Sequence, residues 1–519
     1  MIKAGKTIKI EIEEEIIDIM KNTMKFFCEA VLCIATVVMM GCSKDEEQPV
    51  ASGKVVVSTT TIELERGAAS KHLDESGTKT FADGEKIAVV YENAGSEMVK
   101  AEVTLTAGDI SNGGKSVIIT VAMTDPKANG TVKFIYPASM ANADGTVNYS
   151  GLYKGQNGTM ATLSNNFDLA VCNSTLTANA ELPANPVLTN QLSVCKFTLQ
   201  NTANSQDMTS SVTKLTVKHG SDVYFVTPAT TGQTTFWVAV KPIAAGSGNI
   251  DIYAAVGKDL YKKSVSSYGT LAAGTFNRVT VAVAKIDGAL SGLFSINNSG
   301  DLVYFSQGNL RYESSAWSFF DNQYEYYSTY SENAWDKFGW STAATTYGMN
   351  TSINNDDYSG SFVDWGNALG SGWRTPTGDS RGEWDYLCNT RTTPSGVRYA
   401  LATVNDVKGL ILLPDDWNTS YHTLSSTNTR NADFATNSIS LQDWTSNLEA
   451  HGAVFLPAAG WRNGSLVSDV GQRLFYWSAT HFVNHDDQAY NLNFLSVELR
   501  PDGFLSRSYG CSVRLVRQI

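Results

Sequence analysis

Short apolar runs of strand length recur roughly every 8–15 residues through the first half of this chain, separated by turn dipeptides such as Asn-Gly, Asp-Gly and Gly-Gly. Runs of this length that are rich in Val, Ile, Phe and Tyr are typical of β-strands joined by tight turns. Helices would need apolar residues at helical spacing over longer windows. The pattern therefore predicts β-sandwiches, with strands at 55–64, 87–91, 103–105, 117–121, 132–136, 167–171, 194–199, 212–217, 223–226, 236–240, 250–255 and 279–283.

This strand-rich part is too long for one sandwich, because a sandwich of seven strands takes about 100 residues and about 230 are present. We divide it into a first sandwich at 55–160 and a second sandwich at 161–287.

The composition changes from about residue 288 onward. Ten of the 11 Trp residues lie beyond this point, and Trp237 is the exception in the strand-rich part. Two segments have apolar residues at helical spacing: 380–390, with Trp384, Leu387 and Cys388 on one face, and 441–451. We therefore expect residues 288–519 to form a separate α+β domain.

The charge of the chain excludes one class of partner. The formal net charge is −12, from 39 Lys and Arg against 51 Asp and Glu, and no basic stripe is present. Nucleic-acid binding depends on clustered Lys and Arg that contact phosphates, so we expect no nucleic-acid partner.

The N-terminal region has the features of an export signal. Met24, a lysine and a short apolar stretch lead to Gly41 and Cys42. A small residue before such a cysteine marks the cleavage site of bacterial lipoprotein signals, where the new N-terminal cysteine is acylated. We expect Met24 to be the true start, 1–41 to be a signal peptide, Cys42 to carry lipid in the outer membrane and 42–54 to be a tether. An ordinary signal peptide with an incidental cysteine is the alternative.

Four cysteines remain in the expected mature chain: Cys172, Cys195, Cys388 and Cys511. An even number in an exported protein is compatible with two disulfides. Cys172 and Cys195 lie in apolar runs that could be neighbouring strands, so either a bridge or two buried free thiols fits them. A zinc site is disfavoured because the chain has no Cys-x-x-Cys pair.

A set of segments follows the signal in a fixed order. After the signal that ends at Cys42 come the early strand that ends near Arg66 and the segments Phe81-Ala-Asp-Gly-Glu-Lys-Ile-Ala-Val89, Phe134-Ile-Tyr-Pro137, Gln156-Asn-Gly-Thr159, Phe167-Asp-Leu169 and Leu271-Ala-Ala-Gly-Thr-Phe276. In these segments residues 55–286 resemble the fimbrillin family, the lipoproteins that build type V pili. This resemblance implies two tandem transthyretin-like β-sandwiches.

The resemblance also implies a mode of assembly. A protease cuts after a basic residue beyond the first strand, this strand leaves, and a strand of a neighbouring pilin subunit takes its place. Arg66 is the candidate cut site, with Lys71 and Lys79 as rivals. The simpler interpretation is an ordinary edge strand followed by a solvated arginine. A large C-terminal domain would occupy the end that passes to the next subunit, which suits the tip of a fimbrium.

The C-terminal part carries a second set of segments: Val303-Tyr-Phe-Ser-Gln-Gly-Asn-Leu-Arg-Tyr312, Phe338-Gly-Trp340, Gly372-Trp-Arg-Thr-Pro-Thr377, Glu383-Trp384, Leu410-Ile-Leu-Leu-Pro-Asp-Asp-Trp417, Gly452-Ala-Val-Phe-Leu-Pro-Ala-Ala-Gly460, Tyr476-Trp-Ser478 and Ser512-Val-Arg-Leu-Val516. In these segments residues 291–519 look like a C-type-lectin-like module of bacterial surface proteins. This resemblance implies adhesion to a host glycan or protein and a Cys388–Cys511 disulfide.

We expect most tryptophans of this module to be core residues. Sugar-binding members carry calcium motifs, and Asp415-Asp416-Trp417-Asn418 matches these only superficially because it lacks the acid after Asn. Asn355-Asp356-Asp357 and Asp486-Asp487 are candidate calcium positions, although adjacent acids are usually solvated turns. We expect no other cofactor or metal.

We expect no enzymatic activity. The C-type-lectin-like fold also includes formylglycine-generating enzymes, which need reactive cysteines, and His481 and His485 lack a third metal ligand. The sequence thus predicts a cell-surface lipoprotein of the fimbrium, with other pilin subunits as partners. The alternative is an outer-membrane lipoprotein that binds glycans or host proteins without polymerising.

Overall fold

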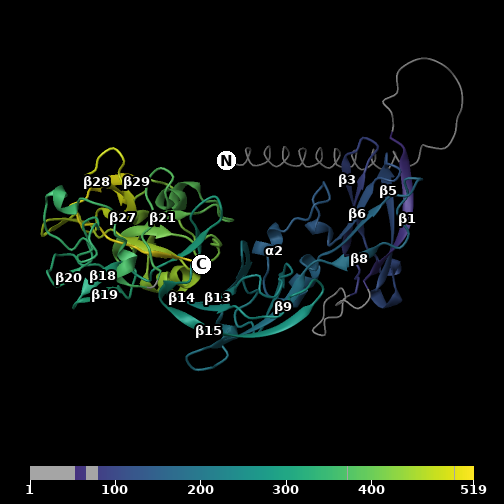
Figure 1. The fold of residues 1–519 in the computed structure, drawn as a ribbon, viewed down its shortest axis with the longest axis horizontal. Helices are drawn as coiled ribbons and strands as arrows, with labels where there is room; N and C mark the ends of the chain where they lie inside the picture. The colour runs from purple at the N-terminus through teal and green to yellow at the C-terminus, as the bar shows by residue number, and fades with distance from the viewer. Residues whose placement is uncertain (1–52, 66–79, 371, 496) are drawn as a thin grey trace, which may run out of the picture. The chain divides into compact units, whose positions relative to one another are not determined.

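The structure is a computed structural model that describes residues 53–65, 80–370, 372–495 and 497–519. Its contacts separate Met1–Lys54 from Val55–Ile519, and all elements below belong to the second of these units. The unit is built mainly of β-strands with short helices between them, as Figure 1 shows. The mainly β fold that the sequence predicts is therefore confirmed.

An eight-stranded sheet forms first. Its strand order is β3(Met98–Thr104), β2(Lys86–Glu92), β6(Thr131–Tyr136), β7(Ala170–Thr175), β8(Val187–Asn190), β1(Val55–Leu64), β5(Ser116–Thr124) and β4(Ile110–Ser111). Apolar side chains of β2 and β6 share one core cluster with those of β1 and β5, so the two halves of the sheet face each other as in a sandwich. Alternation along β5, where Val117, Ile119 and Val121 are buried and Thr120 is exposed, has the period expected for a half-buried strand.

A seven-stranded sheet follows. Its order is β11(Asp222–Val226), β10(Lys214–His219), β13(Ile250–Val256), β14(Asp259–Val265), β15(Phe276–Leu290), β9(Ser193–Asn201) and β12(Phe236–Val240). Side chains from β10 and β13 meet those of β9 and β12 in one core cluster.

The two sheets repeat one topology. If the two-residue strand β4 is set aside and the strands of each sheet are numbered along the chain, both sheets have the order 3-2-5-6-7-1-4. In both, the first strand lies between the last strand, which is parallel to it, and the fourth, which is antiparallel. β1 therefore corresponds to β9, and β8 corresponds to β15. Two tandem units of one architecture are present.

The division expected at residues 160 and 161 does not match this strand order. β7 and β8 lie beyond it, yet β7 pairs with β6 and β8 pairs with β1, so the first sheet extends to Asn190. The segment around residue 160 contains short helices instead.

Short helices and helical turns connect the strands of the two sheets. They are η1(Ala107–Asp109), η2(Asn112–Gly114), η3(Ala138–Met140), α2(Ser150–Lys154), α3(Met160–Asn166) and η4(Thr209–Ser211).

Residues from 291 onward form small sheets that are linked by turns. The strands are β16(Phe294–Ser295), β17(Leu302–Phe305) and β30(Val516–Gln518); β18(Leu310–Glu313), β19(Ala316–Phe319) and β20(Ala334–Trp335); β21(Tyr399–Val404), β22(Val407–Leu412), β23(Ser438–Ile439) and β24(Val454–Pro457); β25(Trp461–Asn463) and β26(Leu466–Ser468); and β27(Leu474–His481), β28(Gln488–Phe494) and β29(Leu499–Ser506). The early strand β17 pairs with β30, so this region closes on itself.

Both predicted helical segments are helical. The first comprises α4(Glu383–Asp385) and the π-helical turn η7(Tyr386–Thr390), and Trp384, Leu387 and Cys388 are fully buried. The second comprises α5(Leu441–Asp443), the π-helical turn η9(Trp444–Leu448) and η10(Glu449–His451). The remaining turns of the region are η5(Asn355–Tyr358), η6(Trp365–Ala368) and η8(Phe434–Thr436).

Tryptophans form much of the core of this region, as the sequence predicts. Beyond residue 288 every Trp except Trp317 and Trp461 is buried. Trp340, Trp384 and Trp477 donate their indole N–H groups to backbone carbonyls, which satisfies the one polar atom of each ring.

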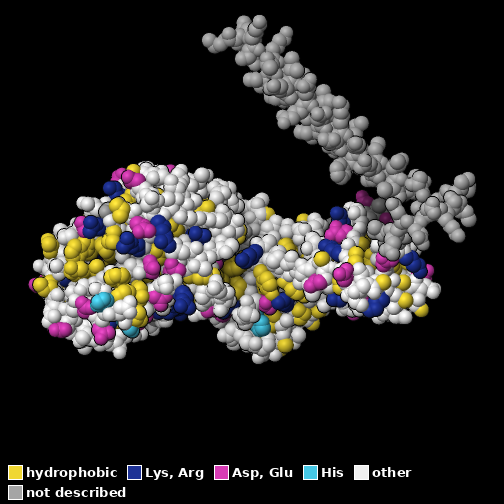
Figure 2. Space-filling view, turned by 90° about the horizontal axis from the view of Figure 1, so that it is seen from above, with side chains coloured by type: hydrophobic (Ala, Val, Ile, Leu, Met, Phe, Trp, Pro, Cys, Tyr) yellow, Lys and Arg dark blue, Asp and Glu magenta, His cyan; other side chains and the backbone are white. Residues whose placement is uncertain are grey.

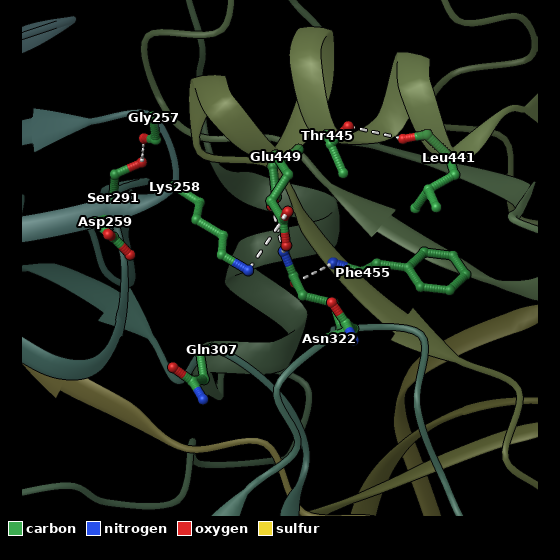
Figure 3. A network of polar contacts seen from close by, with 12 residues as sticks. Gly257, Lys258, Asp259, Ser291, Gln307, Asn322, Leu441, Thr445, Glu449 and Phe455 are labelled. Atoms are coloured by element: carbon green, nitrogen blue, oxygen red, sulfur yellow. Dashed lines mark hydrogen bonds and ion pairs between the residues drawn. The ribbon is translucent and has the colours of Figure 1, made fainter. Parts of the chain in front are cut away.

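The second sheet packs directly against this region. The turn between β13 and β14 provides Lys258, whose ammonium lies 3.9 Å from the carboxylate of Glu449, and Ser291 Oγ donates to the Gly257 carbonyl at 2.9 Å (Figure 3). Glu449 also accepts from Gln323 Nε2 at 3.1 Å. Tyr253 of β13 shares a core cluster with the aromatic residues of the region.

No helix among the described residues is long and apolar enough to pass through a membrane.

Candidate functional site

The strand β1 is the element for which the sequence predicts a role in assembly. It pairs with β5 along nine positions, from Val55 opposite Thr124 to Glu63 opposite Ser116. Its other edge pairs with β8 at two positions only, Glu63 and Leu64. β1 is therefore held by backbone hydrogen bonds mainly from one side.

The inward face of β1 is unusually polar for its position. Ser58 and Thr60 are buried, and they lie opposite the apolar Val121 and Ile119 of β5. Ser58 Oγ accepts from the Leu182 N–H at 2.9 Å, and Thr60 Oγ1 donates to the Pro183 carbonyl at 2.7 Å. On this edge of β1, the two side chains bind the backbone of Leu182 and Pro183, in the segment before β8, where a longer neighbouring strand would pair with the β1 backbone. Only toward its end does β1 bury large apolar groups, Ile62 and Leu64.

The corresponding strand of the second sheet differs in both respects. β9 buries the apolar side chains of Cys195, Phe197 and Leu199. It is paired on both edges, with β12 along five positions and with β15 along eight, from Phe276 to Val283. The second sandwich thus holds its first strand much more firmly than the first sandwich does.

Residues Cys42, Arg66, Lys71 and Lys79, expected to carry lipid or to be cut, lie outside the described residues.

The expected disulfides are not present: Cys172, Cys195, Cys388 and Cys511 are free thiols. The reason is their placement in different cores. Cys172 packs against the cluster of the first sheet, whereas Cys195 belongs to that of the second. Cys388 lies in η7 within one cluster of the C-terminal region, and Cys511 lies beside Phe338 in another.

Burial also controls the chemistry of these thiols. It raises the pKa of Cys195 to about 12 and that of Cys388 to about 12, and it raises the pKa of Cys511 well above the usual 9.0. Neutral thiols are poor nucleophiles, and burial favours the neutral form of both Cys388 and Cys511.

The thiols predict a labelling pattern. Of Cys172, Cys195, Cys388 and Cys511, iodoacetamide at pH 8 should modify only the partly exposed Cys172 in the native protein. After unfolding without reductant, all four should react, which peptide mass spectrometry can count. Resistance of any pair to alkylation after unfolding would reveal a disulfide.

The pKa of Cys388 also predicts how stability depends on pH. Because the pKa of this thiol is higher in the folded state than in the unfolded state, the unfolded state binds fewer protons between pH 9 and 12. The free energy of unfolding should therefore fall as the pH rises through this window.

The two candidate calcium positions lie beside each other. Asn355 Nδ2 donates to Asp487 Oδ2 at 3.2 Å and to Ser506 Oγ at 2.8 Å, and Asn355 Oδ1 accepts from the Ser508 N–H. The Asn355 amide oxygen is thus already used within the protein. In the described part of the chain, no group of three or more His, Cys, Asp or Glu side chains is placed to hold a metal ion.

The Asp415-Asp416-Trp417 segment has a structural role. Asp415 accepts from Arg391 at 2.8 Å and from the Ser295 N–H at 3.0 Å. Asp416 pairs with Lys214 of β10 at 2.7 Å, and Trp417 is buried. The segment lines a cavity of about 360 Å³ together with Phe225, Lys154 and other residues, but both carboxylates in it are already paired.

Several residues that the sequence analysis missed stand out in the structure. Ser58 and Thr60 belong to a run of four hydroxyl residues inside β1, a signal that could have indicated a weakly packed strand. Phe482, Tyr490 and Phe504 come together only through the pairing of β27, β28 and β29, so no local pattern points to them. His481 and His485 are exposed, as expected.

No protein-family model matches the chain, and no curated protein matches it. Solved structures similar to part of it include a fimbrial assembly protein from Parabacteroides distasonis (11% identical, covering 49% of this chain and 96% of that one, TM-score 0.26) and a candidate cell adhesion protein from Bacteroides fragilis (16%, 44% and 91%, TM-score 0.27). A minor pilin of Streptococcus agalactiae is similar at 9% identity (44% and 96%, TM-score 0.19).

Proposed function

We propose that this chain is a cell-surface fimbrial subunit whose first strand is exchanged during assembly. The observation that carries the proposal is the arrangement of β1: one edge is paired along nine positions, the other along two, and the buried face includes Ser58 and Thr60. A strand held in this way can be replaced by one that fits better, because strand addition restores both the backbone hydrogen bonds and the apolar burial of an open sheet.

The energetics favour replacement. Fully burying a Val or Ile side chain contributes about 1.5–3 kcal/mol relative to leaving it exposed. A donor strand with such residues opposite Val121 and Ile119 would bury apolar surface where β1 presents two hydroxyl side chains. If it also pairs with β8 beyond the two positions that β1 uses, the added burial and backbone pairing would outweigh the loss of the Ser58 and Thr60 hydrogen bonds, and the exchange would be favourable once β1 is free to leave.

The second sandwich is unsuited to the same exchange. β9 is paired along both edges and lies in the middle of the chain, between the first sheet and β15. It cannot leave without unfolding its neighbours. The proposal therefore assigns strand exchange to the first sandwich alone.

We further propose that both sandwiches are of the transthyretin-like kind and that residues 288–519 form a C-type-lectin-like domain. The repeated strand order supports the first assignment, and the closure of the region by β17 and β30 supports the second. β15 continues from the second sheet to Leu290, so this region follows the last strand at once. A chain end occupied in this way suits a tip subunit, with the terminal region used for adhesion.

Attachment and maturation complete the proposal. Lipid on Cys42 would hold the uncut chain at the outer membrane, and a cut after Arg66 would separate both the lipid and β1 from the rest. We propose no enzymatic activity, which the buried, neutral Cys388 and Cys511 support.

The test is proteolysis followed by assembly. We expect an arginine-specific protease to cut the purified full chain once between residues 64 and 80, and the cut protein to lose residues 55–64 when pilin subunits are added. Arg66→Lys should block the cut, and Lys71→Gln is the matched control that should not. Cut protein that keeps β1 and stays monomeric would favour the alternative, a lipoprotein that binds glycans or host proteins without polymerising.

A second variant tests the energetic argument. Ser58→Thr should strengthen β1, because it keeps the hydroxyl that accepts from the Leu182 N–H and adds one methyl group beside Val121. A buried methyl group contributes about 0.8 kcal/mol, so we expect this variant to be cut normally but to exchange β1 about fourfold more slowly, as measured by release of the labelled strand. Exchange at the wild-type rate would contradict the role of the polar inward face of β1.

A further inference from the structure

Four aromatic side chains meet at the surface of the sheet formed by β27, β28 and β29. The ring of Phe482 stacks on Phe504 with centroids 4.3 Å apart and an interplanar angle of 20°. The Phe482 ring is also parallel to the ring of His485, with centroids 5.9 Å apart. It forms a T-shaped contact with the ring of Tyr490, with centroids 5.1 Å apart. Tyr490 of β28 and Phe504 of β29 are directly opposite each other in the sheet. We call these four residues the aromatic stack.

The stack is open to solvent. Phe504 is 50% exposed although it is one of the largest apolar side chains. One of its ring faces lies against Phe482, so its exposed part includes the other face. His485 is exposed as well, and Val483 beside it is 68% exposed. Figure 2 shows that hydrophobic side chains gather in separate patches on the visible face of the molecule. Apolar patches rimmed by polar residues mark binding surfaces.

Carboxylates from two different elements stand beside the stack. Asp379 follows Gly378, which packs against the side chain of Tyr490. Partial burial raises the pKa of the Tyr490 phenol, and Asp379 and Asp502 raise it further. Asp502 precedes Phe504 by two residues on β29, so the two side chains point to the same side of the sheet. The surface therefore combines an exposed ring face with a phenol hydroxyl and two hydrogen-bond acceptors.

The backbone at Asp379 is strained, and the loop that carries Asp379 packs tightly against neighbouring strands. Its φ of 129° is one that residues with a side chain rarely adopt. The loop packs tightly, because a Cβ at the preceding Gly378 would lie 2.5 Å from Ser478 Oγ and 2.7 Å from the Tyr490 Cβ. Asp379 Oδ1 accepts from the Arg381 N–H at 2.7 Å. Strain of this kind costs about 1–3 kcal/mol and concentrates at binding sites.

We propose that the aromatic stack, with Asp379 and Asp502, binds an uncharged glycan. A pyranose ring has an apolar C–H face that fits the open face of Phe504, and its hydroxyls donate to carboxylates at the ring edge. The two carboxylates would repel sialylated or sulfated sugars, so the neutral class is favoured. This inference rests on the proposed adhesive function of residues 288–519 and assigns it a site and a ligand class.

The experiment measures binding of the full chain to soluble mannan, galactan and β-glucan, and to one mucin before and after desialylation, by affinity electrophoresis. We expect at least one neutral polysaccharide to bind and the mucin to bind better after desialylation. Phe504→Ala should weaken binding by about tenfold, and Tyr490→Phe and Asp502→Asn by smaller factors. Val497→Ala is the control: Val497 is 70% exposed, lies just before β29 and is outside the stack, so binding should not change.

Three outcomes would overturn the inference: no binding to any neutral polysaccharide, undiminished binding by Phe504→Ala with an unchanged circular dichroism spectrum, or preference for the sialylated mucin. The cleavage and exchange assay distinguishes a failure of the glycan-binding inference from a failure of the proposed fimbrial function. Phe504→Ala should still be cut and should still exchange β1, because the stack lies outside the first sandwich.

Discussion

Ile62→Asp is expected to release β1 from the first sandwich without any proteolytic cut. Ile62 is fully buried opposite Val117, among the apolar side chains of the first core. A carboxylate at this position would have no partner, and burying an unpaired charge or removing a large core side chain each costs several kcal/mol. We expect the first sandwich to lose about 3 kcal/mol or more of its free energy of unfolding, because β1 has little pairing on its other edge to hold it.

Hydrogen–deuterium exchange provides the measurement. Amides of β5 at residues 116–124 should lose protection in Ile62→Asp, while those of β9 and β12 in the second sheet should keep it. Val57→Asp is the matched control, since it places the same charge on the same strand at a position that is 66% exposed. It should change stability by less than about 0.5 kcal/mol. Equal protection of β5 in both variants would mean that β1 does not pack as described.

Asp415→Ala should destabilise the C-terminal region by about 3–5 kcal/mol, because it leaves a buried cation without its partner. Arg391 is fully buried, and its guanidinium donates to Asp415 at 2.8 Å. Burial lowers the pKa of Arg391, yet an arginine remains charged at any moderate pH. Asp415 also accepts from the Ser295 N–H, so its loss removes the support of β16 as well.

The neighbouring residue supplies the control for this prediction. Asp416→Ala removes a pair with Lys214 that is partly open to solvent, and exposed pairs contribute about 1 kcal/mol or less. Thermal unfolding followed by tryptophan fluorescence suits the measurement, because most of the tryptophans lie in this region. Equal losses for the two variants would contradict the importance of the buried arginine. Addition of calcium should change neither result, since both carboxylates are occupied by cationic side chains.

The β-rich first half could be predicted because its signals are local. Alternating burial in β5 and the turn residues between strands are visible in short windows of sequence, and so are the helices around Trp384 and Trp444. Besides the two-residue strand β4, two strands escaped the prediction for related reasons. β8 is only four residues long, and β14 carries Lys262, Lys263 and Ser264 within its seven residues, so neither has the appearance of an apolar run.

The boundary at 160 and 161 and the pairing of the cysteines could not be obtained in the same way. Assigning β7 and β8 to the first sheet depends on contacts with β6 and β1, which lie far away in the sequence. Cysteine spacing likewise does not reveal which core each thiol enters.

The amino-acid sequence alone determined the β-rich character, the change of composition near residue 288 and the burial of most tryptophans, because strand propensity and apolar content act over a few residues. The tertiary structure alone decided that two sheets share one strand order, that β1 is held mainly along one edge, and that Phe482, Tyr490 and Phe504 meet at the surface. Each of these depends on which distant strands exchange backbone hydrogen bonds, and the N–H and C=O groups that form them are the same in every residue type except proline.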